Sequence, residues 1–212
     1  DTRTRLYSEL ELEHAVASSK DVGEVDLEQA YIERDLTDSQ HARVGIFLMP
    51  IGIMNEHHEP DVFYGVERNP VETEIIPTTW REAGVGLHGD ITSGWNYDAA
   101  VHSGLKAPID GADAFLPSHS LQEAAKATAE DPAMTARIRY QGIPGLELSL
   151  SGQYQDDVTQ GLGERARAFL WETHAVFQRG PFGLRALYAA WDIGGDQAKA
   201  LGRDKQDGWY VE

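Results

Sequence analysis

Most of the chain is made of short segments in which apolar and polar side chains alternate. In the segment 81–91, Val85 and Leu87 alternate with Gly86 and His88. A period of two residues indicates β-strands that have one apolar and one polar face. The alternation predicts strands at 9–16, 24–31, 42–49, 81–91, 95–102, 136–141, 146–153, 165–177 and 182–191, with a further strand starting at 209–212.

The connections between these strands alternate between short and long. Tight turns such as 92–94 and 142–145 follow every second strand, whereas the two longest connections cover about 50–80 and 105–134. Loops of that length are unusual inside a compact soluble domain. A β-barrel of the bacterial outer membrane has this asymmetry, with short periplasmic turns and long external loops. The expected strand length of about nine to twelve residues also suits a tilted membrane strand.

The sequence therefore predicts an all-β protein, an antiparallel up-and-down transmembrane β-barrel in a single domain over residues 1–212. Five aromatic residues near the tight turns match the girdle that such barrels carry at the periplasmic interface; cross-strand aromatic packing within any sheet is the alternative. They are Trp95, Tyr97, Tyr140, Phe177 and Phe182. The segment 209–212 is too short to cross a bilayer, and lipid does not tolerate an open sheet edge. We therefore expect the chain to be part of a longer barrel.

Composition narrows the class further. The 212 residues carry a formal net charge of -17 and contain no cysteine, which excludes a disulfide scaffold and thiol chemistry. No apolar run reaches the roughly 20 residues of a membrane helix. The mean hydropathy of -0.43 still fits a barrel, because alternating strands average out as hydrophilic. The acidic balance argues against nucleic acid as a partner.

The loop at 50–80 holds a dense set of charges, Glu67, Arg68, Glu72 and Glu74. If this loop folds into the barrel, these residues form a constriction in which charged rings set ion selectivity. The alternative is an ordinary solvated loop surface.

Six strand residues are expected on the polar, pore-lining face: Arg43, Glu82, Asp98, Arg137, Arg139 and Arg185. The phase of its strand makes Arg167 a weaker candidate. The first two strands place acidic residues on the same face, namely Glu9, Glu11, Glu13, Glu24, Asp26 and Glu28. Opposed charges across a pore would orient polar solutes; the alternative is salt bridging within the wall.

Neither a metal site nor a catalytic site is predicted. His57, His58 and Glu59 are zinc-ligand types, but adjacent residues in an extended segment point in opposite directions, and no third ligand stands at a fixed spacing. Loop packing or pore lining is therefore preferred for them. His102, Glu172 and His174 are not accompanied by a nucleophile elbow or a phosphate-binding glycine motif. We expect no enzymatic activity and no cofactor.

Two local features are also predicted. Ser120 can cap a short helix at 120–126, with Glu123 completing a capping box. Gly84 and Gly86 are expected to thin their strand where the long loop packs against it.

Several motifs resemble one family of membrane proteins. They are NEHHEP at 55–60, FYGVERNP at 63–70, IIPTTW at 75–80, AAVHSG at 99–104, GPFGLRALY at 180–188 and GWYVE at 208–212. With these motifs the sequence is similar, over most of its length, to the phosphate-selective porin O and P family of Gram-negative outer-membrane porins. The resemblance implies a barrel of about sixteen to eighteen strands, usually trimeric, surrounded by outer-membrane lipid and lipopolysaccharide.

The chain departs from that family in two respects. Phosphate selectivity in the family depends on rings of lysine and arginine, whereas the first strands here are acidic, so phosphate selectivity is not expected. The chain also lacks the C-terminal aromatic residue that ends most such barrels, as a partial barrel would.

The leading prediction is a passive diffusion channel for small hydrophilic solutes or ions, narrowed by the 50–80 loop. Two alternatives stay open: an outer-membrane barrel whose external loops act as an enzyme or adhesin, and a soluble β-rich binding domain. The transported solute, the sign of the selectivity and the oligomeric state are not determined by these patterns.

Overall fold

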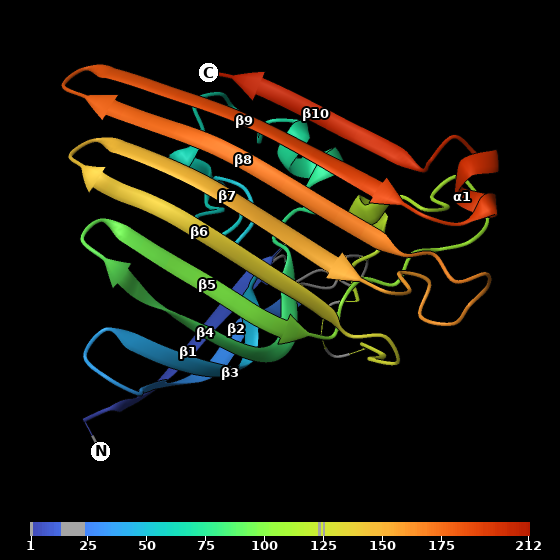
Figure 1. Cartoon of the computed structure of the whole chain (residues 1–212), viewed down its shortest axis with the longest axis horizontal. Coiled ribbons are helices and arrows are strands. Elements are labelled where there is room, and N and C mark those ends of the chain that lie inside the picture. Colours follow the sequence, from blue (N-terminus) through green and yellow to red (C-terminus); the bar gives the residue numbers. More distant parts are fainter. Residues whose placement is uncertain (1, 14–23, 123, 125) are drawn as a thin grey trace, which may run out of the picture.

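The computed structural model describes residues 2–13, 24–122, 124 and 126–212. Within them the protein is all-β, a single antiparallel sheet in which each strand pairs with the next along the chain (Figure 1). The strands are β1 (Thr4–Glu13), β2 (Glu24–Asp35), β3 (Gln40–Leu48), β4 (Arg81–Thr92), β5 (Trp95–His102), β6 (Ala133–Ile143), β7 (Leu146–Gln155), β8 (Ala168–Arg179), β9 (Phe182–Ile193) and β10 (Lys205–Val211).

The predicted alternation of short and long connections is confirmed. The short turns join the strands at one end of the sheet, and the long connections join them at the opposite end (Figure 1). The short turns are 36–39, 93–94, 144–145 and 180–181, and the long connections are 49–80, 103–132, 156–167 and 194–204. Gly145 shows why one of the turns needs glycine. Its φ is +83°, and a Cβ there would lie 2.1 Å from the carbonyl oxygen of Gln178.

Four short helical turns lie in the described parts of the long connections. These are η1 (Pro60–Val62), η2 (Val71–Ile75), η3 (Pro117–His119) and α1 (Asp196–Ala200). No helix among the described residues has the length and apolar character needed to span a membrane.

The described sheet is curled but not closed. Its strand order runs from β1 to β10, so these two strands are its edges. In Figure 1, β1–β3 pass behind β5–β7, and segments of the long loops are seen behind β8 and β9. The structure thus confirms an up-and-down meander and does not contain a closed barrel.

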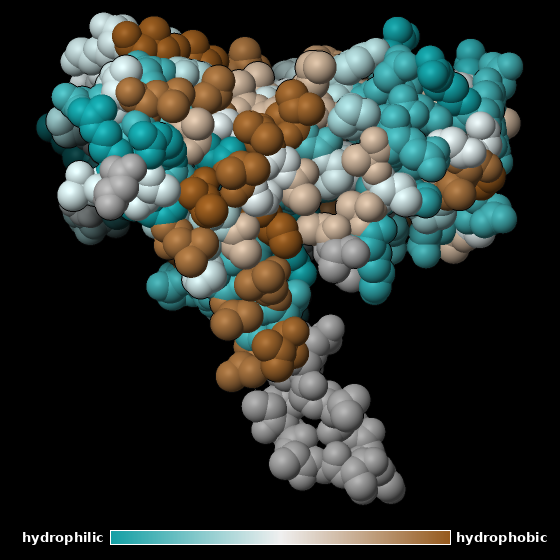
Figure 2. Space-filling model, turned by 90° about the horizontal axis from the view of Figure 1, so that it is seen from below, coloured by the Kyte–Doolittle hydropathy of each residue, from teal (hydrophilic) through white to brown (hydrophobic). Residues whose placement is uncertain are grey.

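The apolar and polar faces of this sheet differ in burial. Leucines and valines of the apolar faces point outward, with Leu10 67%, Val85 56%, Leu148 43% and Leu184 48% exposed. Figure 2 shows such hydrophobic residues gathered in a band over the strands, with a more hydrophilic end toward the long loops. The polar faces of the strands are covered by the long loops. A core between sheet and loops includes Phe47, Trp80, Leu105, Phe115 and Trp191.

The phase of β2 differs from the prediction. In the sequence, Val25 and Leu27 alternate with acidic residues, and the same period predicts Tyr31 on their apolar face. In the structure the ring of Tyr31 instead stacks on Tyr7 at 4.9 Å and meets Phe47 edge-on at 6.3 Å. The register between β1 and β2 shifts beside Glu9, and such a bulge moves the following side chains to the opposite face.

The helix predicted at 120–126 is wrong for the described residues. Ser120 follows η3, and its hydroxyl donates back to the carbonyl oxygen of Leu116 at 2.6 Å instead of capping a helix. Gln122 is coil, and its side-chain amide bonds to Gly104 and Thr128. Glu123 lies outside the described residues, as do the predicted strand end at 14–16 and the side chains of Glu13 and Glu24.

The two glycines of β4 make room for different neighbours from those expected. A Cβ on Gly84 would lie 2.4 Å from the carbonyl oxygen of Val101, in the adjacent strand. A Cβ on Gly86 would lie 3.0 Å from Nε of Arg43. Both glycines therefore make room for the adjacent strands β3 and β5, and not for the long loop.

Candidate pore-lining surface

The β3–β4 loop, residues 49–80, is held at its base by one buried amide. The side-chain nitrogen of Asn55 donates to the carbonyl oxygens of Met49 at 2.8 Å and Trp80 at 2.9 Å. Its oxygen accepts the backbone N–H of Trp80 at 2.7 Å. The amide thereby gives the buried N–H of Trp80 an acceptor. It also adds a second hydrogen bond to two carbonyl oxygens, because Trp80 already accepts the N–H of Met49 and Met49 that of Ile51, both at 2.8 Å.

The same loop is bonded to the middle of the sheet through Arg137. This arginine of β6 has a side chain only 3% exposed and binds Asp98 of β5, with Nη2 to Oδ2 at 2.7 Å. Its other terminal nitrogen binds Glu56 of the loop. A buried guanidinium needs such partners, because an unpaired charge is costly away from water.

Glu72 connects the loop to the far edge of the sheet. One carboxylate oxygen accepts the backbone N–H groups of Ile53 at 3.0 Å and Met54 at 2.8 Å, and the other accepts the hydroxyl of Tyr210 in β10. Burial raises the pKa of Glu72 above its ordinary value, and these hydrogen bonds offset only part of that rise. Desolvation dominates because the side chain is enclosed by its own loop and β10.

Two further contacts reach β9. The indole N–H of Trp191 donates to the carbonyl oxygen of Ile75 at 2.8 Å. The guanidinium of Arg185 lies over the ring of Tyr64, 4.0 Å from its centroid. The β3–β4 loop therefore crosses the polar side of the sheet from β3 to β9 and β10.

The charged loop residues predicted to form a constriction do not share one environment. Glu67 and Glu74 are exposed, whereas Glu72 is buried. Arg68 donates to the carbonyl oxygen of His58 at 3.1 Å. Burial lowers the pKa of Arg68, with Glu72 opposing that effect.

The predicted strand residues lie on the polar side of the sheet. Besides the Asp98–Arg137 pair, Arg139 donates to the side chain of Asn96 at 2.9 Å. Arg43 lies over the ring of Phe47 at 4.1 Å. Arg167 lies before β8 and is exposed.

Glu82 is fully buried at the start of β4. It accepts the indole N–H of Trp80 at 3.0 Å and the hydroxyl of Ser103. Glu82 thus binds the last residue of the β3–β4 loop and the first residue of the β5–β6 connection, and it does not border open space. No spacing rule in the sequence connects Glu82 to Ser103 or Arg137 to Glu56, so these pairs were not predicted.

His174 lies between two carboxylates. Its Nδ1 is 2.7 Å from Glu172 and its Nε2 is 3.1 Å from Glu147. The hydroxyl of Ser151 donates to Glu172 at 2.6 Å and is not bonded to the imidazole. Both ring nitrogens are used by carboxylates, so the geometry lacks the nucleophile–base contact that hydroxyl catalysis requires.

Comparison with known proteins shows a similarity to a longer bacterial protein. No family model matches the chain. A protein of Aquifex aeolicus (strain VF5), described only as an uncharacterized protein, is 35% identical over 196 residues. The match covers 89% of this chain and 42% of the relative, so the chain spans about two fifths of the length of the curated protein it resembles.

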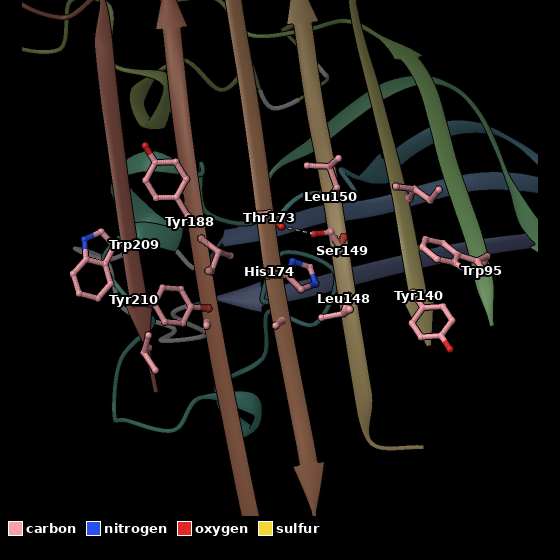
Figure 3. A pocket seen from close by; sticks show the side chains of 15 residues that line it. Trp95, Tyr140, Leu148, Ser149, Leu150, Thr173, His174, Tyr188, Trp209 and Tyr210 are labelled. Atoms are coloured by element: carbon pink, nitrogen blue, oxygen red, sulfur yellow. Dashed lines mark hydrogen bonds between the residues drawn. The ribbon is translucent and has the colours of Figure 1, made fainter. Parts of the chain in front are cut away.

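The outward face opposite this surface carries aromatic rings around a shallow apolar hollow of about 630 Å³. Trp95 and Tyr140 border one side, with ring centroids 4.9 Å apart, and Tyr188 and Trp209 border the other (Figure 3). The small side chains of Ala175 and Ala186, which are paired across β8 and β9, contribute to the lining. The outward face is therefore apolar but not smooth.

Proposed function

We propose that this chain forms part of the wall of a porin-like diffusion channel in the bacterial outer membrane. The channel passes small hydrophilic solutes or ions, its outward face contacts lipid and lipopolysaccharide, and it assembles as a homotrimer. The ten strands supply part of a barrel of about sixteen to eighteen. The match of this chain to only 42% of a longer relative supports the idea that further strands complete the barrel.

The exposure of the apolar strand faces carries the proposal. Leu10, Val85, Leu148 and Leu184 are each more than two fifths exposed, and removing one such side chain from water is worth about 1.5–3 kcal/mol. A soluble sheet gains this energy by packing its apolar face against protein. Here the space between sheet and loops is filled from the polar side, so the apolar face is left for hydrocarbon, which also fills its hollows.

Aromatic residues at two depths support the same placement. Phe177 and Phe182 are exposed near the short turns, as the predicted girdle requires. Tyr154 and Phe169, paired across β7 and β8 near the long loops, are 40% and 46% exposed. Outer-membrane barrels carry such girdles at both interfaces.

Conduction needs no chemical step in this proposal. The long loops that cover the polar side of the sheet line the water-filled passage together with the parts of that side that they leave exposed. The β3–β4 loop narrows the passage because it crosses from β3 to β9 and β10. Glu67 and Glu74 are exposed on that loop, and an acidic lining concentrates cations. The channel therefore prefers cations.

Single-channel recording of the full-length protein in planar bilayers tests the proposal. We expect discrete conductance steps with a cation preference that falls in the Glu67→Gln/Glu74→Gln variant. A heat-denatured sample of the same preparation is the control. If well-folded protein gives no steps, the channel proposal fails; if it stays in the aqueous fraction without detergent, it is a soluble β-rich protein.

A further inference from the structure

A histidine of the β3–β4 loop meets acidic residues from two strands at the β1 edge of the sheet. Single ligand atoms of Glu9, His58 and Glu59 all lie within 4.8 Å of one another. Glu9 belongs to β1, and the other two belong to the loop. The sequence could not show this group, because its third member stands far from the His58–Glu59 pair in the chain.

The two ring nitrogens of His58 are in different states. Nε2 is 2.8 Å from a carboxylate oxygen of Glu28 in β2. Nδ1 is buried and has no hydrogen-bond partner among the described residues, and the side chain is only 10% exposed. A buried polar atom without a partner calls for a specific explanation.

This pattern is that of a metal-binding histidine. In metalloproteins the ligating imidazole usually donates its other ring N–H to a carboxylate, which fixes the tautomer and orients the lone pair. Glu28 stands in the position of that carboxylate, and Nδ1 is then the nitrogen left to bind a metal.

The charge around His58 also favours a cation. Glu11 lies against Glu28, so Glu9, Glu11, Glu28 and Glu59 bring four carboxyl groups to one region. The nearby positive charge of Arg68 is directed to the backbone, because its guanidinium donates to the His58 carbonyl oxygen at 3.1 Å. Carboxylates this close together repel one another unless a proton or a cation lies among them.

We propose that Nδ1 of His58 and the carboxylates of Glu9 and Glu59 bind a divalent transition-metal ion such as Zn²⁺, with Glu28 as the orienting partner. Zn²⁺ accepts imidazole and carboxylate ligands together, whereas Ca²⁺ and Mg²⁺ take oxygen ligands. The ion ties the β3–β4 loop to β1. The site does not depend on conduction.

Calorimetric titration of the EDTA-treated full-length protein with Zn²⁺ tests the site. We expect saturable binding at one site per chain, weakened at least tenfold in His58→Gln and about 10- to 100-fold in Glu28→Gln, the usual cost of losing an orienting partner. His57→Gln is the matched control, because His57 is the exposed neighbour of His58; its affinity stays unchanged.

Two outcomes overturn the proposal: wild-type protein that shows no saturable Zn²⁺ binding, and His57→Gln that loses as much affinity as His58→Gln. Thermal unfolding of the same variants, once with EDTA and once with Zn²⁺ in its place, separates metal binding from folding. We expect Zn²⁺ to raise the melting temperature of the wild type and to leave that of His58→Gln unchanged. Should His58→Gln fail to refold, Glu59→Gln at an exposed position replaces it, with the same expected loss of affinity. The conductance recordings are independent of all these readouts.

Discussion

Arginine in place of Leu150 is expected to destabilise the protein in a lipid bilayer by about 2–4 kcal/mol, the cost of that side chain near the midplane of a membrane barrel. Leu150 lies in the middle of β7, is paired with Ile138 and Thr173, and is 53% exposed. A charge there must leave water for hydrocarbon. Urea unfolding of the protein refolded in lipid vesicles measures the effect.

Ile143→Arg is the matched control. Ile143 is 51% exposed, close to the value for Leu150, but it ends β6 beside the short turn at 144–145. At the membrane interface the cost falls to about 0–1 kcal/mol. Equal and small effects at both positions would indicate an outward face in water, where surface substitutions cost within about 0.5 kcal/mol.

Arg137→Met is expected to be the most damaging change on the polar side, at about 3–5 kcal/mol. It leaves the buried carboxylate of Asp98 without its ion pair and releases Glu56 of the β3–β4 loop. Methionine retains much of the side-chain volume, so the loss reports on charge more than on packing. Chemical unfolding in the same vesicles gives the magnitude.

Neutralising the partners is the control for that loss. Arg137→Met combined with Asp98→Asn and Glu56→Gln should recover most of the stability, because no uncompensated charge is then buried. If the triple variant is no more stable than the single one, the arginine acts through packing, and the described ion-pair geometry does not explain its burial.

The strands could be predicted from the sequence because their pattern is local. In β7, Leu148 and Leu150 point outward, whereas Ser149 and Ser151 are buried, as alternation requires. The prediction failed where a non-local event changes the phase. The register shift beside Glu9 is set by the pairing of β1 with β2, so the face of Tyr31 could not be inferred from β2 alone.

The candidate site was predictable only in part, for the same reason. The polar faces of Asp98 and Arg137 follow from their own strands, but the contact with Glu56 depends on how the long loop folds. Glu72 was grouped with its charged neighbours in sequence. Its enclosure by Met54 and Tyr210 depends on β10, which is distant in the chain.

The central claim is that the outward side chains of these strands contact hydrocarbon. The chain has no cysteine, so a single spin label can be attached at Leu148→Cys, Leu150→Cys or Ile143→Cys and its relaxation measured in lipid vesicles. We expect labels at 148 and 150 to be relaxed by oxygen dissolved in lipid and protected from a water-soluble nickel complex, with less protection at 143. Strong relaxation by the nickel complex at 148 and 150 would place this face in water and contradict the account.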